Sequence, residues 1–155
     1  MLKRRRDGSY ELRLAADDRA FLAGLADQMD ELLDEAPDDP SLRRLSPPAY
    51  LDEEDIVREA EYQVFMADDL RKSRRASLGV LRGTAQRTDL TEEEVVRWMQ
   101  AINAIRLVLG TRLGIDSDEY EIDVDEDDPL APTWAVYDVL SVLLEHTVRA
   151  LSDQL

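Results

Sequence analysis

TEEEVVRWMQAINAIRLVLGTRLG, residues 91–114, is the most regular amphipathic stretch of the sequence and decides its fold class. Thr91 and Glu94 have the spacing of a capping box, in which each side chain accepts a hydrogen bond from the other residue's backbone N–H. Gly114 is a suitable stop. The stretch therefore predicts a helix over residues 91–114. Its apolar face has the i, i+3, i+4, i+7 spacing and consists of Val95, Trp98, Met99, Ile102, Ile105, Leu109 and Leu113.

Two further amphipathic helices are expected, over residues 17–35 and 133–152. The first ends before Pro37 and Pro40, which cannot continue a helix. Its apolar stripe consists of Phe21, Leu22, Leu25, Met29, Leu32 and Leu33. The apolar stripe of the second consists of Tyr137, Leu140, Leu144, Val148 and Leu151.

Residues 52–86 form the longest helical stretch, and apolar residues lie on two of its sides. One stripe consists of Ile56, Ala60, Ala67, Leu70, Leu78 and Leu81. Nearer the opposite side lie Tyr62, Phe65, Met66, Ala76 and Val80. A helix that is apolar on both sides is usually covered on both. We therefore expect this helix to run through the middle of a bundle.

A β-hairpin is expected over residues 1–14. Asp7 and Gly8 form a dipeptide that accepts the positive φ angles of a two-residue type I′ turn. The run that follows alternates apolar with polar residues, as in a strand with one buried face. Its apolar members are Tyr10, Leu12 and Leu14.

Residues 116–130 are predicted to form an acidic loop. Nine of the thirteen residues from 116 to 128 are acidic and none is basic, which favours a solvated segment. Within it Tyr120, Ile122 and Val124 alternate with acids, so residues 120–124 could add a short strand beside the hairpin. Taken together, the patterns predict one mainly α-helical domain over residues 1–155. Its architecture would be a bundle of about four helices with a small N-terminal β-hairpin.

The charge of the chain limits its partners. Lys and Arg number 19 against 35 Asp and Glu, so the formal net charge is −16. Such a surface repels a phosphate backbone as a whole, which argues against nucleic-acid binding unless a basic face is segregated. No long apolar run suggests a signal peptide or a membrane-spanning helix, so we expect no membrane association and a cytoplasmic location.

The residue types also limit the chemistry. The sequence contains no cysteine, which excludes disulfides, thiolate metal sites and cysteine nucleophiles. His146 is the only histidine, so a catalytic triad or a zinc site would have to be built on it. The run from Asp123 imitates the start of a calcium loop, but Asp128 and Trp134 occupy the positions of the required glycine and glutamate. We predict no catalytic residue, metal ligand or cofactor, which favours a protein that is not an enzyme without deciding the question.

The central helix also carries a family resemblance. Residues 101–115, AINAIRLVLGTRLGI, resemble the signature of the bacterial DUF2017 family, a domain of unknown function. Weaker matches follow the family's order at LSPPAY (45–50), at EY and DDLR within 61–71, and at YDVL (137–140), although the family more often has Phe in place of Tyr62. The resemblance covers most of the chain and implies one compact fold with no assigned reaction. Family genes often neighbour the gene of the Clp protease adaptor S, which implies a link to proteolysis, and some members are labelled transcriptional regulators.

Arg106 lies within the apolar stripe of the 91–114 helix, where a hydrophobic residue would be expected. A buried charge must be paired, because leaving it unpaired costs several kcal/mol. One interpretation is a structural ion pair with Asp69, Asp138 or Glu145. The other is a pocket that binds phosphate or carboxylate through bidentate guanidinium contacts. The ligand-binding residues would then be Arg71, Arg74, Arg106 and Arg112.

Two charged surfaces are candidates for partner binding. Residues 71–87 contain a basic patch that includes Lys72 and Arg75, and the acidic loop offers Asp123, Asp125 and Asp127. Because the patch could also bind the acidic loop of a second copy, a homodimer is left open.

Three functions are therefore considered. The first is a non-enzymatic cytoplasmic regulatory or adaptor-like protein that acts through protein contacts, with a Clp component as a partner suggested by the resemblance. The second is a small-anion binding protein or enzyme that uses the arginine cluster. The third is a DNA-binding transcriptional regulator, whose binding would depend strongly on salt.

Overall fold

The computed structural model describes residues 1–45, 52–115 and 127–152, and it confirms a mainly α-helical fold with four long helices and a small N-terminal sheet. The long helices are α1 (Ala16–Glu35), α2 (Ile56–Thr84), α3 (Glu92–Arg112) and α4 (Ala131–Ser152). Two short 3₁₀ helices, η1 (Pro40–Leu45) and η2 (Glu53–Asp55), lie between α1 and α2. The strands are β1 (Leu2–Arg4), β2 (Tyr10–Leu12) and β3 (Asp89–Leu90).

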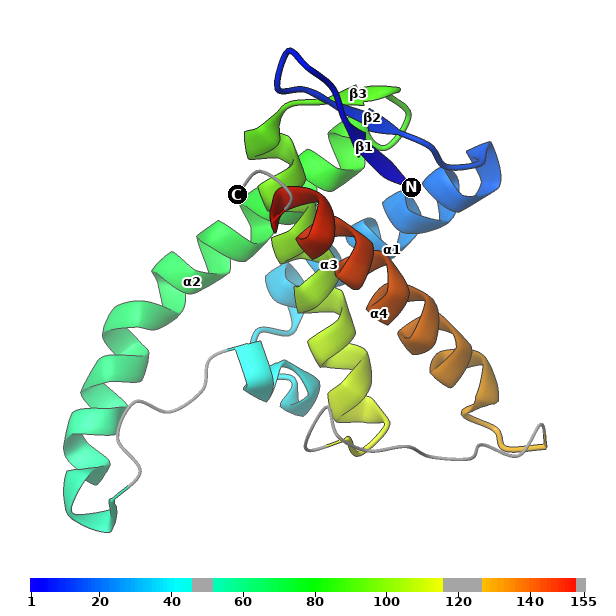
Figure 1. Ribbon diagram of the computed structural model, residues 1–155. Helices are drawn as coiled ribbons and strands as arrows, with labels where there is room; N and C mark the ends of the chain where they lie inside the picture. Colours follow the sequence, from blue (N-terminus) through cyan, green and yellow to red (C-terminus); the bar gives the residue numbers. More distant parts are fainter. Residues whose placement is uncertain (46–51, 116–126, 153–155) are drawn as a thin grey trace.

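Helix α3 is the centre of the fold. It packs against α2, α4 and η1, and Figure 1 shows it in the middle of the molecule. The predicted capping box is present, since Thr91 Oγ1 accepts from Glu94 N over 3.2 Å and Glu94 Oε1 accepts from Thr91 N over 3.0 Å. One face of the helix is entirely inaccessible to solvent at Val95, Trp98, Ala101 and Ile102. The core therefore forms around this helix.

The N-terminal sheet is antiparallel, with strand order β1-β2-β3. The predicted hairpin is present, but its turn is not the expected type I′. Gly8 has a φ of +88°, whereas no described residue other than glycine has a positive φ, so Asp7 cannot occupy the first position of that turn. Instead Gly8 N donates to Arg5 O over 3.1 Å and the strands pair from Arg4 and Tyr10 outward, which leaves a longer loop ending in a left-handed glycine.

The third strand is β3, directly before α3, where Leu90 pairs with Tyr10. Sequence patterns did not indicate this strand, because two residues are too few to show alternation. The strand considered for residues 120–124, like most of the acidic loop, lies outside the described residues.

The expected place of α2 in the middle of the bundle was wrong. Its buried residues, Ser77, Leu78, Leu81 and Thr84, all lie in its last part. The first half projects from the body of the molecule, as both figures show. The error has a physical cause: α2 packs against α1 and α3 chiefly through its C-terminal half, and no apolar residue of the described first half is fully buried. We call residues 56–70 of α2 the arm.

Candidate protein-contact surface on helix α2

The base of α2 is fixed to α3 in the core. Leu78 and Leu81 are completely buried. Trp98 Nε1 donates to Thr84 Oγ1 over 2.7 Å, and the same hydroxyl donates to Val80 O over 2.7 Å. These contacts set the direction in which the arm leaves the molecule.

A second set of contacts binds α2 to α1. Arg75 donates to Asp30 Oδ1 over 2.8 Å and to Asp34 Oδ1 over 3.1 Å, and Arg82 donates to Asp27 Oδ1 over 2.8 Å. The hydrogen bond from Arg75 holds the pKa of Asp30 below its ordinary value; partial burial opposes this effect, and the positive charges of Arg75 and Arg82 add to it. Exposed ion pairs stabilise a fold only slightly. They do identify the side of α2 that faces α1.

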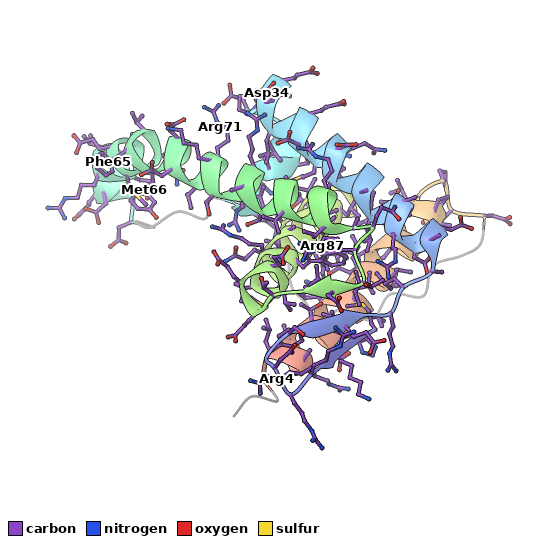
Figure 2. All side chains as sticks on the ribbon, turned by 90° about the horizontal axis from the view of Figure 1, so that it is seen from above. Arg4, Asp34, Phe65, Met66, Arg71 and Arg87 are labelled. Atoms are coloured by element: carbon purple, nitrogen blue, oxygen red, sulfur yellow. The ribbon has the colours of Figure 1, made fainter. Side chains whose placement is uncertain are left out.

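The side of α2 that faces α1 extends along the arm beyond the end of α1. Val57, Val64, Arg75 and Arg82 are separated by seven, eleven and seven residues, spacings that return to one face of a helix. The two arginines bind carboxylates of α1, but α1 ends at Glu35, and Figure 2 shows Arg71 near the level of Asp34 at the end of α1 and Phe65 farther out on the arm. The face that α1 covers near the base is therefore bare farther out.

The exposed surface of the arm around Val64 is apolar. Val64 is 82% exposed and Phe65 is 79% exposed, and Ile56 and Val57 are exposed to a similar degree. Together with Ala60 these side chains line one shallow hollow, bordered by Glu61. We call Ile56, Val57, Ala60, Val64 and Phe65 the apolar patch. Single exposed apolar residues are common on soluble proteins, whereas a contiguous exposed group is a candidate contact site.

The surroundings of the apolar patch are acidic. Residues 52–69 contain eight acidic residues and one basic residue, Arg58, which gives a formal charge of −7. Arg58 lies 3.7 Å from a carboxylate oxygen of Asp55. The next cations along the helix, Arg71 and Lys72, each lie 2.9 Å from Asp68, and this contact raises the pKa of Lys72. The patch is thus an apolar surface with an acidic rim.

The four arginines predicted to bind an anion do not share one pocket. Arg71 and Arg74 line a pocket of about 760 Å³ between α2, η1 and the end of α1, together with Arg43. Arg74 donates to Leu45 O over 3.2 Å, and its buried Nε has no hydrogen-bond partner. Asp38, Asp39 and Asp68 line the same pocket, so its charge is mixed.

Arg106 and Arg112 lie elsewhere. Arg106 is partly buried between α3 and α4, where Nε donates to Ser141 Oγ over 2.8 Å and the guanidinium carbon lies 4.8 Å from the centre of the Tyr137 ring. Arg112 is exposed at the end of α3 and borders a separate hollow between α1 and α3.

The predicted partner-binding residues are only partly described. Lys72 is exposed and paired with Asp68, whereas Arg75 is bound to α1 as given above. Asp123 and Asp125 lie outside the described residues, and Asp127 is exposed at their edge.

The most buried charged residue was missed by sequence reasoning. Arg19 is 8% exposed, and its guanidinium donates to the carbonyl oxygens of Leu12, Leu14, Ala85 and Arg87. It thereby joins α1 to β2 and to the segment between α2 and β3. The signal was present, because Arg19 precedes the buried residues Leu22, Ala26, Met29 and Leu33 at alternating spacings of three and four.

The described part of the chain contains no group of three or more His, Asp or Glu side chains placed to hold a metal ion. None of its helices is both long and apolar enough to cross a bilayer. His146 is exposed on α4.

Comparison with known proteins gives named relatives. Residues 1–151 match the model of the family described as "Domain of unknown function (DUF2017)". A protein of Mycobacterium leprae named "Putative oxidative stress regulator AosR" is 35% identical over 130 residues, which cover 74% of this chain and 59% of that protein. The protein named "Oxidative stress regulator AosR" of Mycobacterium tuberculosis is 30% identical over 184 residues, which cover 94% of this chain and 84% of that protein, and the Mycobacterium bovis protein of the same name gives the same values.

The chain thus spans 59% of the length of its M. leprae relative but most of the length of the others. No solved structure matches it. The family model matches nearly the whole chain, including the signature in α3. The chain therefore belongs to the DUF2017 family.

Proposed function

We propose that this chain is a non-enzymatic regulatory protein that acts by binding another protein through the apolar patch on the arm of α2. The observation that carries the proposal is the exposure of Val64, 82%, on a helix face that α1 covers only near the base, with Phe65, 79% exposed, lining the same hollow. Burying a Val or Phe side chain stabilises a complex by about 1.5–3 kcal/mol. Burial of the apolar patch against a partner would therefore favour binding.

The names of the relatives suggest what is regulated. Proteins similar to this chain over most of its length are named oxidative stress regulators. This chain has no cysteine, so it cannot detect an oxidant through a thiol of its own. Its role in such a response would be to transmit a signal by contact with a partner.

The test is genetic and uses a matched control. The gene is deleted in its host and replaced by the wild type, by the patch variant Val64→Ser/Phe65→Ser, or by the control Val139→Ser/Val142→Ser, which alters exposed valines on α4. Transcripts are measured before and after a peroxide challenge. We expect the control variant, but not the patch variant, to restore the wild-type response. Equal restoration by both variants would overturn the proposal.

The finer predictions remain proposals. A Clp component is the partner suggested by the gene neighbourhood of the family, and direct binding of the purified proteins tests it. A cytoplasmic site of action is proposed as well, in keeping with the location expected from the sequence. DNA binding predicts a mobility shift that disappears at high salt, against which the formal charge of −16 argues.

A small-anion site is the second candidate function. It is favoured by the buried Nε of Arg74, which has no hydrogen-bond partner in a pocket that Arg43 and Arg71 also line. Calorimetric titration with phosphate tests it. Loss of binding in Arg74→Gln would support the site, whereas no measurable binding to the wild type would remove it.

A further inference from the structure

We propose that the partner segment that binds the apolar patch is an amphipathic helix whose apolar stripe is flanked by lysine and arginine. The inference rests on the proposed function and names the chemistry of the partner. It is argued from the geometry of the patch, from the charge around it and from the state of the nearby cations.

The geometry of the patch favours a helix as its occupant. The patch lies on a regular α-helix, whose interior backbone groups are already hydrogen-bonded, so it offers side chains and not a strand edge. It extends from Ile56 to Phe65, which is about 14 Å at the rise of an α-helix. A partner helix of two to three turns, with apolar residues at the i, i+3, i+4, i+7 spacing, would cover this length.

The charge around the patch favours basic flanks on that helix. The segment that carries the patch has a formal charge of −7, and the whole chain has −16. Lys and Arg can also lay their aliphatic stems on apolar surface while their charged ends reach the acidic rim. Opposite charge across such a rim speeds association and selects partners.

The nearby cations offset only part of this charge, since residues 52–72, which include Arg71 and Lys72, still have a formal charge of −5. Arg58 lies beside Asp55, and Arg71 and Lys72 both contact Asp68, so each is engaged by a carboxylate three or four residues earlier in the chain. Arg75 is engaged by Asp30 and Asp34 of α1. A partner carboxylate would therefore have to compete with pairs that already exist.

The same charge argues against a second copy of the chain on this face. Placing two arms together would bring a formal charge of −7 beside another of −7. Like charges that face each other across an interface oppose association. A homodimer through the apolar patch is therefore an alternative that the experiment must be able to detect.

The experiment uses the purified full chain and two model peptides of eighteen residues. One peptide contains Leu at the i, i+3, i+4, i+7 positions and Lys elsewhere, and the other has Glu in place of Lys. Binding is measured by titration, and the contact is located from backbone NMR shifts of the ¹⁵N-labelled chain. We expect the Lys peptide to bind, with shift changes concentrated in residues 56–69 and an affinity that falls as salt rises.

The variants then separate apolar contact from simple attraction between charges. We expect Val64→Ser/Phe65→Ser to weaken binding of the Lys peptide by about tenfold or more. Val139→Ser/Val142→Ser should leave binding unchanged, since its valines lie on α4. Loss of affinity in Glu54→Gln/Glu61→Gln would further support the basic flanks. Equal binding of both peptides, or shift changes centred on α1 or α4, would overturn the inference.

Oligomeric state completes the test. If the chain elutes as a dimer that Val64→Ser/Phe65→Ser converts to a monomer, the occupant is a second copy and the inference is wrong. The test of the proposed function in the host does not depend on the peptide experiment. A patch variant that fails in the host although the Lys peptide does not bind would retain the regulatory function and reject only the basic helix as its partner.

Discussion

Trp98 donates its indole hydrogen bond to Thr84 across the boundary between α3 and the base of α2, over 2.7 Å and out of contact with water. Replacing Thr84 by valine removes the acceptor but keeps the shape, so the indole N–H is left buried without a partner. We expect Thr84→Val to lower the free energy of unfolding by about 1–3 kcal/mol. Thr84→Ser retains the hydroxyl and should lose less. Urea denaturation of both variants checks this, and equal losses would contradict the role of the hydrogen bond.

Arg19 gives the largest expected effect of a single polar residue. Its guanidinium donates to four backbone carbonyl groups from three parts of the chain. Arg19→Met keeps much of the apolar stem but leaves these carbonyls without their donor, so we expect a loss of about 3 kcal/mol or more. Arg19→Lys keeps the charge but not the planar fork and should recover only part of this loss. Full stability of Arg19→Lys would show that charge alone is sufficient.

The contact between Arg75 and Asp30 predicts a dependence on pH. The pKa of Asp30 is lowered in the folded protein from the ordinary value of 3.8, chiefly by the hydrogen bond from Arg75. The ionised carboxylate therefore stabilises the fold above that ordinary value, and the contribution is lost as the pH falls through the lowered pKa. Arg75→Gln should cost at most about 1 kcal/mol near neutral pH, because the pair is partly exposed.

The difference in unfolding free energy between wild type and Arg75→Gln should shrink as the pH falls below about 4. An NMR titration of the Asp30 carboxyl group provides the direct measurement. Its pKa should be higher in Arg75→Gln than in the wild type. An unchanged pKa would remove the hydrogen bond as the cause.

Two glycines should respond to alanine in opposite directions. Gly79 lies inside α2 with no atom within 4 Å of an added Cβ, so Gly79→Ala should stabilise the protein by about 0.5–1 kcal/mol. Gly114 follows α3 with a φ of +76°, a conformation that L-amino acids rarely adopt, so Gly114→Ala should destabilise by about 1 kcal/mol. Thermal unfolding of the two variants measures both signs.

The arm should open more readily than the base of the same helix. Fully buried residues of α2 begin only at Ser77, so the arm has less tertiary packing to stabilise it than the base has. We expect its amides to exchange with solvent water at least about tenfold faster than those of residues 78–84. Hydrogen exchange followed by NMR measures this. Uniform protection along α2 would indicate that the arm is covered in solution.

The sequence predicted the helices well, because each repeats one chemical pattern over many residues. The capping box of Thr91 and Glu94 and the stripe through Trp98 and Ile102 located α3 almost to the residue. The turn at Gly8 was assigned to the wrong type. The Asp-Gly dipeptide fits both a type I′ turn, which needs two residues with a positive φ, and a longer loop, in which Gly8 alone has one. Strand β3 was missed because it has only two residues, and its pairing with Tyr10 comes from tertiary contact.

The candidate site was harder to predict, since periodicity shows which face of a helix is apolar but not what covers it. The second stripe of α2, which included Phe65, was taken as a sign of burial on two sides, whereas Phe65 is 79% exposed. Arg106 was singled out as an arginine within an apolar stripe, and it lies against Ser141 and Tyr137 of α4. The same criterion applies to Arg19, but the predicted stripe of the first helix began at Phe21 and so left Arg19 out.

The arm also changes how the molecule moves through water. The arm has 15 residues and therefore projects over about 22 Å, whereas a compact chain of 155 residues has a radius of gyration of about 15 Å. A rod attached to a sphere meets more friction than the sphere and rotates most easily about its own long axis. The protein should therefore sediment more slowly than its mass of 17.7 kDa suggests. Its tumbling should be anisotropic, with the slowest reorientation for bonds that lie along α2.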